Sequence, residues 1–183
     1  MGLELLAVIL TLSSAYFTVK GNKICWLLGI GSTAIYLYLV FKEHLYGQVI
    51  SDTIILGQCF YGWFYWKANE DGNMTACSPT KFARDLVLIA ISTAILTILF
   101  RKFTNNPQPE LDAGTTILAL FANGYLAKKF INGYSVWISA DILFIIMFFN
   151  QHMYWTVGLY VILIGFSIKG IIKWIKNTET VYA

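Results

Sequence analysis

Charged side chains are scarce in this sequence. Of its 183 residues, 13% are Asp, Glu, Lys or Arg and 57% are hydrophobic, whereas soluble domains carry about 25% charged residues. A soluble chain of this length cannot bury so much apolar surface. The net charge of +3 is small and scattered, which excludes a basic patch for nucleic acid. The composition therefore predicts a lipid membrane as the surroundings.

Motifs of catalysis and metal binding are absent as well. The sequence has no glycine-rich phosphate loop, no His-Glu-x-x-His and no paired nucleophile and base. Its three cysteines, Cys25, Cys59 and Cys77, lack the spacing of metal ligands and are interpreted as small core residues. We therefore expect neither an enzyme nor a bound cofactor or metal.

Proline is rare, and Pro79, Pro107 and Pro109 all lie in the two polar connections, 67–83 and 104–112. Seven other stretches are continuously apolar and near the roughly 20 residues that a helix needs to cross a bilayer. Their length and lack of alternation favour helices over barrel strands. The expected spans are 3–19, 24–42, 48–66, 84–103, 113–131, 134–150 and 153–174. The sequence thus predicts an all-α membrane protein with seven transmembrane helices, arranged as three, one and three.

A weak internal repeat, with copies in 13–66 and 122–174, supports this division. Because three helices reverse the chain direction, the extra fourth span makes the two copies parallel, and carriers built this way hold substrate between the copies. We expect a first repeat in 1–66, a linker helix at 84–103 and a second repeat in 113–175. The matched residues share one separation in the sequence, which we call the repeat offset: His44 with His152, Gly57 with Gly165, Gly62 with Gly170, Trp66 with Trp174, and, with a small deviation from it, Trp26 with Trp137.

Basic residues indicate the orientation. With seven spans, ten of the thirteen Lys and Arg residues fall on the side that holds the C-terminus. Positive residues accumulate in the cytoplasm, so we expect the N-terminus outside and the C-terminus inside. These ten are Lys20, Lys23, Lys67, Lys81, Arg84, Lys128, Lys129, Lys169, Lys173 and Lys176.

The strongest candidate for a binding residue is Asp141, in the middle of the sixth span. A carboxylate there costs about 2.5–3.5 kcal/mol on insertion scales, so it should face a cavity or a partner. Trp137 precedes it by one helical turn and shares its face. An aromatic face beside a carboxylate suits a flat cation. The alternative is a structural Asp141 hydrogen-bonded to a neighbouring helix, with Trp137 as an interfacial anchor.

Other polar residues within the spans complete the candidate site. Asp52 lies near the outer end of the third span, where it could also be a carboxylate at the helix N-terminus. Ser14 and Asn123 match each other in the repeat, and Gln58 lies deeper in the third span; packing between helices is the alternative for each. Tyr61 is a further candidate, or else a packing aromatic.

Four short motifs occur along the chain: Leu45-Tyr46, Tyr61-Gly62-Trp63-x-x-Trp66, Trp137-x-x-x-Asp141 and Ile172-Lys173-Trp174. With these motifs, residues 5–175 resemble the PnuC family of vitamin transporters. The resemblance implies a fold similar to that of the SWEET sugar carriers and uptake of nicotinamide riboside by facilitated diffusion, with trapping by a cytoplasmic kinase. By the same resemblance, Trp137 would stack on the pyridinium-type ring and Asp141 would occupy the family's Asn/Asp position.

We therefore expect a multi-pass carrier of a bacterial inner membrane. Nicotinamide riboside is the expected substrate, and thiamine or another cationic vitamin is the alternative. Monomer and homotrimer both remain open. The competing class is a seven-helix sensor or receptor. A retinal protein needs a lysine midway along the last helix, and the only candidate, Lys169, lies toward its cytoplasmic end.

Overall fold

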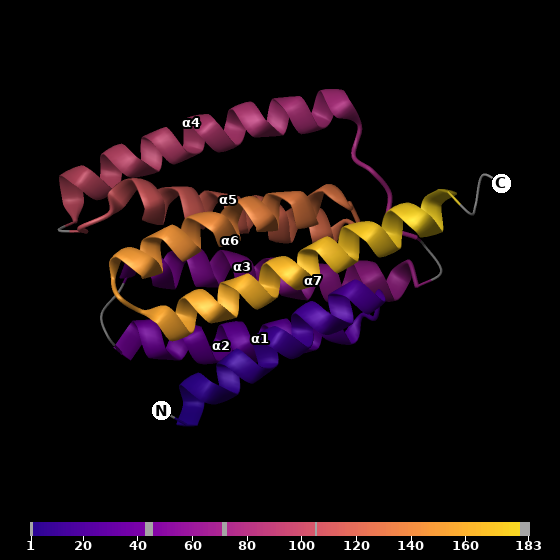
Figure 1. The fold of residues 1–183 in the computed structure, drawn as a ribbon, viewed down its shortest axis with the longest axis horizontal. Coiled ribbons are helices and arrows are strands. Elements are labelled where there is room, and N and C mark those ends of the chain that lie inside the picture. Colours follow the sequence, from indigo (N-terminus) through magenta and orange to yellow (C-terminus); the bar gives the residue numbers. More distant parts are fainter. Residues whose placement is uncertain (1, 43–45, 71–72, 105, 180–183) are drawn as a thin grey trace.

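The structure, a computed structural model, is made of helices. It describes residues 2–42, 46–70, 73–104 and 106–179. His44 and Leu45, which belong to the sequence motifs, lie outside the described residues. The predicted all-α class with seven helices is confirmed, and Figure 1 shows their course. The helices are α1 Gly2–Lys20, α2 Ile24–Lys42, α3 Tyr46–Ala68, α4 Pro79–Phe103, α5 Pro109–Ala127, α6 Asn132–Asn150 and α7 Tyr154–Glu179.

Two helices begin earlier than hydropathy predicts. Helix α4 begins at Pro79, where the Ser78 side chain accepts a hydrogen bond from a backbone N–H of the first turn, and α5 begins at Pro109. Proline suits a first turn because the N–H it lacks would have no partner within the helix. Both prolines, predicted to lie in connections, therefore begin helices instead. Helix α5 also ends sooner, at Ala127, and Lys129 beyond it has a left-handed φ of 58°.

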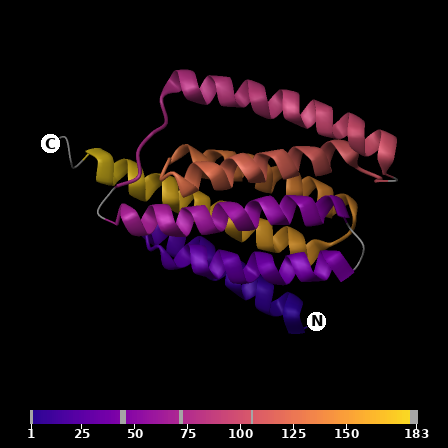
Figure 2. The ribbon, with the colours of Figure 1, turned by 180° about the vertical axis from the view of Figure 1, so that it is seen from behind.

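Six helices form a closed ring, and α4 lies outside it. Within the ring each helix packs on the next in the order α1, α2, α3, α5, α6, α7 and back to α1. The triplets α1–α3 and α5–α7 therefore meet along two seams, α3 with α5 and α1 with α7. Helix α4 packs on α5 and runs along one side of the bundle (Figures 1 and 2).

Equivalent helices of the triplets run in the same direction. Helices α1 and α5 both start at the end of the molecule that holds the N-terminus, whereas α7 ends at the opposite end, near the C-terminus (Figure 1). This is the parallel arrangement expected from an odd linker helix. Which end faces the cytoplasm stays a prediction.

Four helices, α1, α4, α6 and α7, are long and apolar enough to cross a membrane by length and composition, among the described residues. All seven were expected to do so. Helix α3 carries Asp52 and Gln58, and α5 carries Glu110, Asp112 and Asn123. The two helices pack against each other as neighbours in the ring. A face turned toward another helix can hold polar groups that lipid would not accept.

Each triplet is tightened by an aromatic ring lying on a glycine. The Trp26 ring of α2 covers Gly62 of α3, and the Tyr134 ring of α6 covers Gly170 of α7, so closely that a Cβ on either glycine would lie 2.5–2.6 Å from ring atoms. The repeat offset separates Trp26 from Tyr134, as it separates the two glycines. The counterpart of Trp26 is therefore Tyr134, and the predicted match with Trp137 is wrong.

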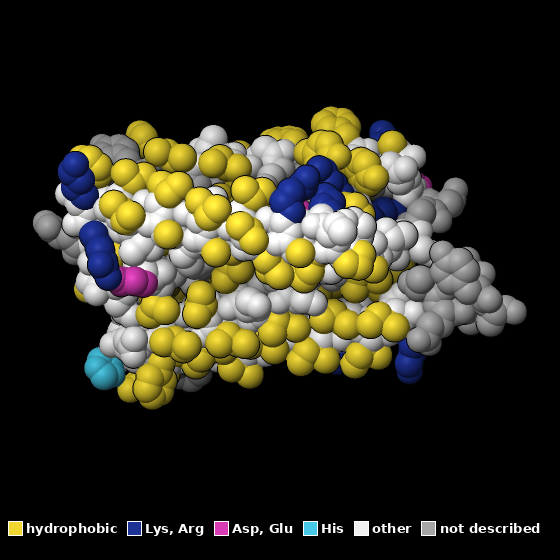
Figure 3. Space-filling view, turned by 90° about the horizontal axis from the view of Figure 1, so that it is seen from above, with side chains coloured by type: hydrophobic (Ala, Val, Ile, Leu, Met, Phe, Trp, Pro, Cys, Tyr) yellow, Lys and Arg dark blue, Asp and Glu magenta, His cyan; other side chains and the backbone are white. Residues whose placement is uncertain are grey.

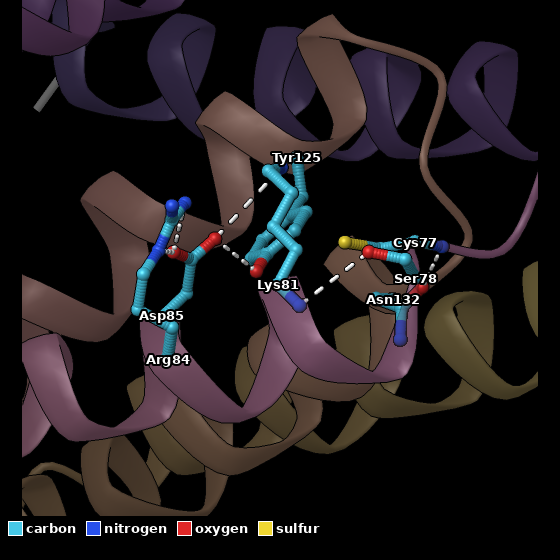
Figure 4. A network of polar contacts seen from close by, with 7 residues as sticks. All are labelled: Cys77, Ser78, Lys81, Arg84, Asp85, Tyr125 and Asn132. Atoms are coloured by element: carbon cyan, nitrogen blue, oxygen red, sulfur yellow. Dashed lines mark hydrogen bonds and ion pairs between the residues drawn. The ribbon is translucent and has the colours of Figure 1, made fainter.

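A polar cluster fixes the start of α4 to the second triplet (Figure 4). The Tyr125 hydroxyl of α5 donates to Asp85 Oδ2 at 2.7 Å, and Arg84 donates to Asp85 Oδ1 at 3.1 and 3.2 Å. The Lys81 ammonium lies 3.8 Å from Asp85 Oδ2. Upstream, the Cys77 backbone N–H donates to the Asn132 side chain of α6 at 2.7 Å. Helix α4 is thus joined to the triplet that follows it.

The outer face of α4 is hydrophobic along most of its length. Figure 3, which looks onto this face, shows hydrophobic side chains along the helix and Lys and Arg side chains toward its ends. The most exposed apolar side chains of α4 include Ile91, Ile95, Ile98 and Phe103, at 52–71%. Such a face suits contact with lipid, as expected of a membrane protein.

Candidate functional site

A cavity of about 500 Å³ lies within the ring of helices. All six ring helices contribute to its lining, whereas no residue of α4 does. The two triplets therefore enclose the cavity, and α4 only connects them. A chamber between two repeats is where a carrier of this architecture is expected to hold its substrate.

One stripe of helix α6 forms a wall of the cavity. Five residues at helical spacing line it: Tyr134, Trp137, Asp141, Phe144 and Phe148. Steps of three and four residues keep side chains on one face of a helix. Trp137 and Asp141 thus share one face of α6, as predicted, and this face lines the cavity. It also includes Tyr134, Phe144 and Phe148, which were not predicted.

Asp141 is the most unusual polar group in this stripe. Its residue is 1% exposed, and among the described residues its Oδ1 atom has no hydrogen-bond partner. The alternative of an Asp141 fixed by a neighbouring helix is thus not supported for this oxygen. A second buried cavity group, the Nε1 of Trp26, also lacks a partner in the described part of the chain. A buried polar group without a protein partner can bind a ligand, an ion or an ordered water.

Three further predicted residues, Ser14, Asp52 and Asn123, line the same cavity. The Ser14 hydroxyl donates to the Cys25 carbonyl at 2.8 Å. The Asn123 amide donates to Gln58 Oε1 at 3.1 Å. The structure therefore brings together five of the seven candidates: Ser14, Asp52, Asn123, Trp137 and Asp141.

Gln58 and Tyr61 do not line the cavity. Gln58 lies in the α3–α5 seam, where it accepts from Asn123 and donates to the Leu120 carbonyl at 3.0 Å. It can orient Asn123 but does not itself face the chamber. Tyr61 is 46% exposed and stacks on Tyr65, with ring centroids 5.7 Å apart. Its expected place in the site is therefore incorrect, because it lies on the outer face of α3.

Sequence reasoning missed an aromatic group further along the α6 stripe. Tyr160 of α7 packs against both Phe144 and Phe148, with ring centroids 4.6 and 5.6 Å away and nearly parallel planes. Phe144 and Phe148 could have been found by extending the face of Asp141 by further helical turns. Tyr160 could have been found from the repeat, since the repeat offset leads to it from Asp52.

The two triplets line the cavity with residues at equivalent positions, but the side chains at those positions differ. Many lining residues of α2 and α3 have a lining counterpart in α6 and α7, one repeat offset later in the sequence. Several pairs differ in size or charge, and the acidic member belongs to the second copy in one pair and to the first in another, so the two triplets give the chamber different walls. The pairs are Gly29 with Trp137, Thr33 with Asp141, Tyr36 with Phe144, Asp52 with Tyr160, Ile55 with Leu163, and Cys59 with Ser167.

The charged groups of the cavity are all acidic. Glu4, Asp52 and Asp141 line it, and among the described residues no Lys, Arg or His does. Like charges around a chamber of low dielectric attract ions of the opposite sign and repel anions. The lining therefore favours a cation with aromatic character.

Comparison with known proteins shows the family of the chain. A family model described as "Nicotinamide mononucleotide transporter" matches residues 1–176. The chain belongs to this transporter family. Among solved structures it is similar to the "Crystal structure of the Vitamin B3 transporter PnuC", with a TM-score of 0.75 and 18% sequence identity over 95% of this chain and 80% of that one. No curated protein gives a significant match.

Membership of the family confirms the resemblance found from the sequence. The likeness to the solved structure, at its low identity, shows that the transporter shares the fold of PnuC. The chain is accordingly a multi-pass membrane protein of a transporter family.

Proposed function

We propose that this transporter carries nicotinamide riboside through the chamber between its triplets. The observation that carries the proposal is the inward stripe of α6, where Trp137 lies one turn from a buried Asp141 whose Oδ1 atom has no described partner. A pyridinium ring is flat and positively charged. It would stack on the indole while the carboxylate supplies the opposite charge.

The charge of the cavity favours the riboside over its phosphorylated form. Nicotinamide riboside carries one positive charge, whereas a phosphate group adds about −1.5 to −2 at neutral pH. With Glu4, Asp52 and Asp141 in the lining and no described basic residue there, a phosphate would meet repulsion and no counterion. The family description names the mononucleotide, and for this chain we favour the unphosphorylated vitamin.

The remaining lining groups suit the sugar. Ribose offers hydroxyl groups that both donate and accept hydrogen bonds, and the cavity presents the polar side chains of Ser14 and Asn123 together with the Trp26 N–H, which has no described partner. The aromatic group of Phe144, Phe148 and Tyr160 extends the wall formed by α6 with apolar surface. Mixed apolar walls with a few polar groups are usual in small-molecule sites.

Movement of the ligand would follow from the ring architecture. The triplets meet at two seams, α3 with α5 and α1 with α7, so rocking of one triplet against the other would open the chamber alternately at its two ends. We infer facilitated diffusion, with retention by a cytoplasmic kinase that phosphorylates the vitamin. The end of the molecule that holds the C-terminus carries ten of the thirteen Lys and Arg residues, and we call it the lysine-rich end. We place this end in the cytoplasm of a bacterial cell, because positive residues accumulate there.

Calorimetric titration of the purified full-length chain tests the substrate. Nicotinamide riboside, nicotinamide mononucleotide, thiamine and riboflavin are compared at one salt concentration. The riboside should bind most tightly, and tighter binding of the mononucleotide would overturn the charge argument. Tightest binding of thiamine would keep the cation site but change the vitamin.

Uptake into proteoliposomes tests the mechanism. With no ion gradient, the internal riboside concentration should rise to the external value and stop. Accumulation above that value when a proton or sodium gradient is imposed would rule out facilitated diffusion.

A further inference from the structure

A second hollow, of about 310 Å³, lies on the α1–α7 seam at the lysine-rich end of the molecule. It is separate in composition from the central chamber, with which it shares only Val19 and Phe166. Its lining combines three lysines with apolar groups: Tyr16, Val19, Lys20, Phe166, Lys169 and Lys173. Nothing in the proposed transport cycle uses these lysines.

Lys20, Lys169 and Lys173 bring three positive charges to one hollow. The Lys173 ammonium donates to the Val19 and Lys20 carbonyls, each at 3.0 Å, which fixes it against the end of α1. The Lys20 ammonium lies 4.9 Å from the Tyr16 ring centroid. Among the described residues, the ion pairs of the molecule involve other lysines and arginines, so no described carboxylate neutralises this group.

The surroundings of the hollow are apolar and face outward. Tyr16 is 44% exposed and meets the Phe166 ring edge-on, with centroids 6.4 Å apart. On α7, Ile172, which follows Lys169 by three residues, is 51% exposed. Both α1 and α7 are candidate membrane spans, and the hollow lies at the C-terminal end of α1 and along the C-terminal half of α7. Cationic groups at this depth meet the headgroup layer while the apolar groups meet acyl chains.

Lysines at the two α7 positions of the hollow are not a general feature of this architecture. In the first triplet, the repeat offset matches Lys169 with Tyr61 and Lys173 with Tyr65. These two tyrosines stack on each other, with planes 28° apart. Equivalent positions of the same architecture are thus occupied by neutral rings in one triplet and by a cationic hollow in the other.

We infer that the hollow binds the phosphate headgroup of an anionic phospholipid. The ammonium groups of Lys20, Lys169 and Lys173 would hold the phosphate, and an acyl chain would run along the exposed apolar side chains beside it. Inorganic phosphate would gain nothing from those apolar groups, which is why the lipid is the chosen occupant. The inference does not depend on which molecule the central chamber transports.

Thermal unfolding of the purified full-length chain in detergent tests the inference. Phosphatidylglycerol is compared with phosphatidylcholine of the same acyl chains, and inorganic phosphate forms a third arm. Phosphatidylglycerol should raise the unfolding midpoint, and the other two additives should not. Equal stabilisation by phosphatidylcholine would overturn a headgroup site, and equal stabilisation by inorganic phosphate would overturn the assignment to lipid.

Matched variants separate the hollow from general surface charge. Lys20→Gln with Lys169→Gln should abolish most of the shift, since each lysine contributes about a fivefold change in affinity for an anionic lipid. Lys67→Gln with Lys128→Gln removes the same charge from exposed lysines outside the hollow and should keep the shift. Equal loss in both pairs would overturn the site.

Native mass spectrometry supplies a measurement that does not depend on unfolding. The wild-type chain should retain phosphatidylglycerol, and the single variant Lys169→Gln should retain about fivefold less. Lys173 is left unchanged because it bonds to backbone carbonyls of α1. Retention that is unchanged in Lys169→Gln would contradict the inference.

Discussion

Trp26 and Tyr134 occupy equivalent places in the two triplets, each with its ring against a glycine of the next helix. Beyond these glycines, Trp26 and Tyr134 contact different partners. Trp26 meets Trp66 edge-on at 5.7 Å, whereas the Tyr134 hydroxyl donates to the Thr18 carbonyl of the other triplet at 3.0 Å. The repeat therefore preserves the packing and varies the polar contacts.

The glycines under these rings should not tolerate a methyl group. Gly62→Ala and Gly170→Ala each place a Cβ at 2.5–2.6 Å from ring atoms, and such overpacking costs about 1–3 kcal/mol. The control variants are Gly57→Ala and Gly165→Ala, on the same helices with nothing within 4 Å. These should be neutral or slightly stabilising. Unfolding midpoints in detergent measure the difference, and equal midpoints for both pairs would refute the packing.

The attachment of α4 should depend on Asp85 and Tyr125. Their hydrogen bond of 2.7 Å joins a carboxylate to a buried hydroxyl, and a bond to a charged group contributes about 1.5–3 kcal/mol. Tyr125→Phe and Asp85→Asn should each destabilise the chain, and the double variant should cost less than their sum. Tyr38→Phe, on an exposed ring, serves as the control. Strict additivity of the two changes would show that the residues do not interact.

Cys59 offers a native probe of the chamber. It lines the cavity, whereas the buried Cys25 and Cys77 do not. A small methanethiosulfonate reagent that enters the chamber should label Cys59, and bound nicotinamide riboside should slow this labelling. The Cys59→Ser variant should lose the signal. Labelling that persists in that variant would show that another thiol reacts, and labelling of Cys59 that the ligand does not slow would place the ligand elsewhere.

Trp137 should contribute part of the binding free energy. Trp137→Ala should weaken riboside binding by about 1–2 kcal/mol, the range of a desolvated cation–π contact, and Trp137→Phe should weaken it less. Trp63→Ala is a control, because Trp63 is half-buried on α3 and lies outside the cavity lining. Calorimetry reports the affinities. Equal affinity in wild type and Trp137→Ala would remove the indole from the site.

Much of this arrangement could be predicted from the sequence because bilayer physics leaves few options. A continuous apolar run must form a helix in lipid, which gave seven helices close to their observed bounds. A carboxylate in such a run must face inward, which placed Asp141 and, through helical spacing, Trp137. Helix starts were missed at Pro79 and Pro109 because hydropathy does not register a proline that opens a first turn.

Other features depend on packing that a pattern does not contain. Tyr61 lies in an aromatic stretch of α3 in which nothing in the sequence separates inner from outer rings. The match of Trp26 with Tyr134 was hidden because the spacing between the repeats changes along the chain. Ser14 and Asn123 are separated by slightly more than the repeat offset. The lining pairs between α2 or α3 and α6 or α7 are separated by the repeat offset itself. The match of Trp26 with Tyr134 becomes clear only from the structure, where each ring packs on a glycine of the next helix.

The carboxylate of Asp141 is the centre of the proposed function, and its removal is the most direct test. Titration calorimetry should compare nicotinamide riboside binding to the wild-type chain and to Asp141→Asn, with Asp112→Asn as a carboxylate control outside the cavity. Because Oδ1 of Asp141 has no partner among the described residues, the amide should leave the unfolding midpoint unchanged or raise it. We predict a loss of affinity of about tenfold or more in Asp141→Asn alone. Wild-type affinity in a well-folded Asp141→Asn variant would contradict a cation site in this chamber.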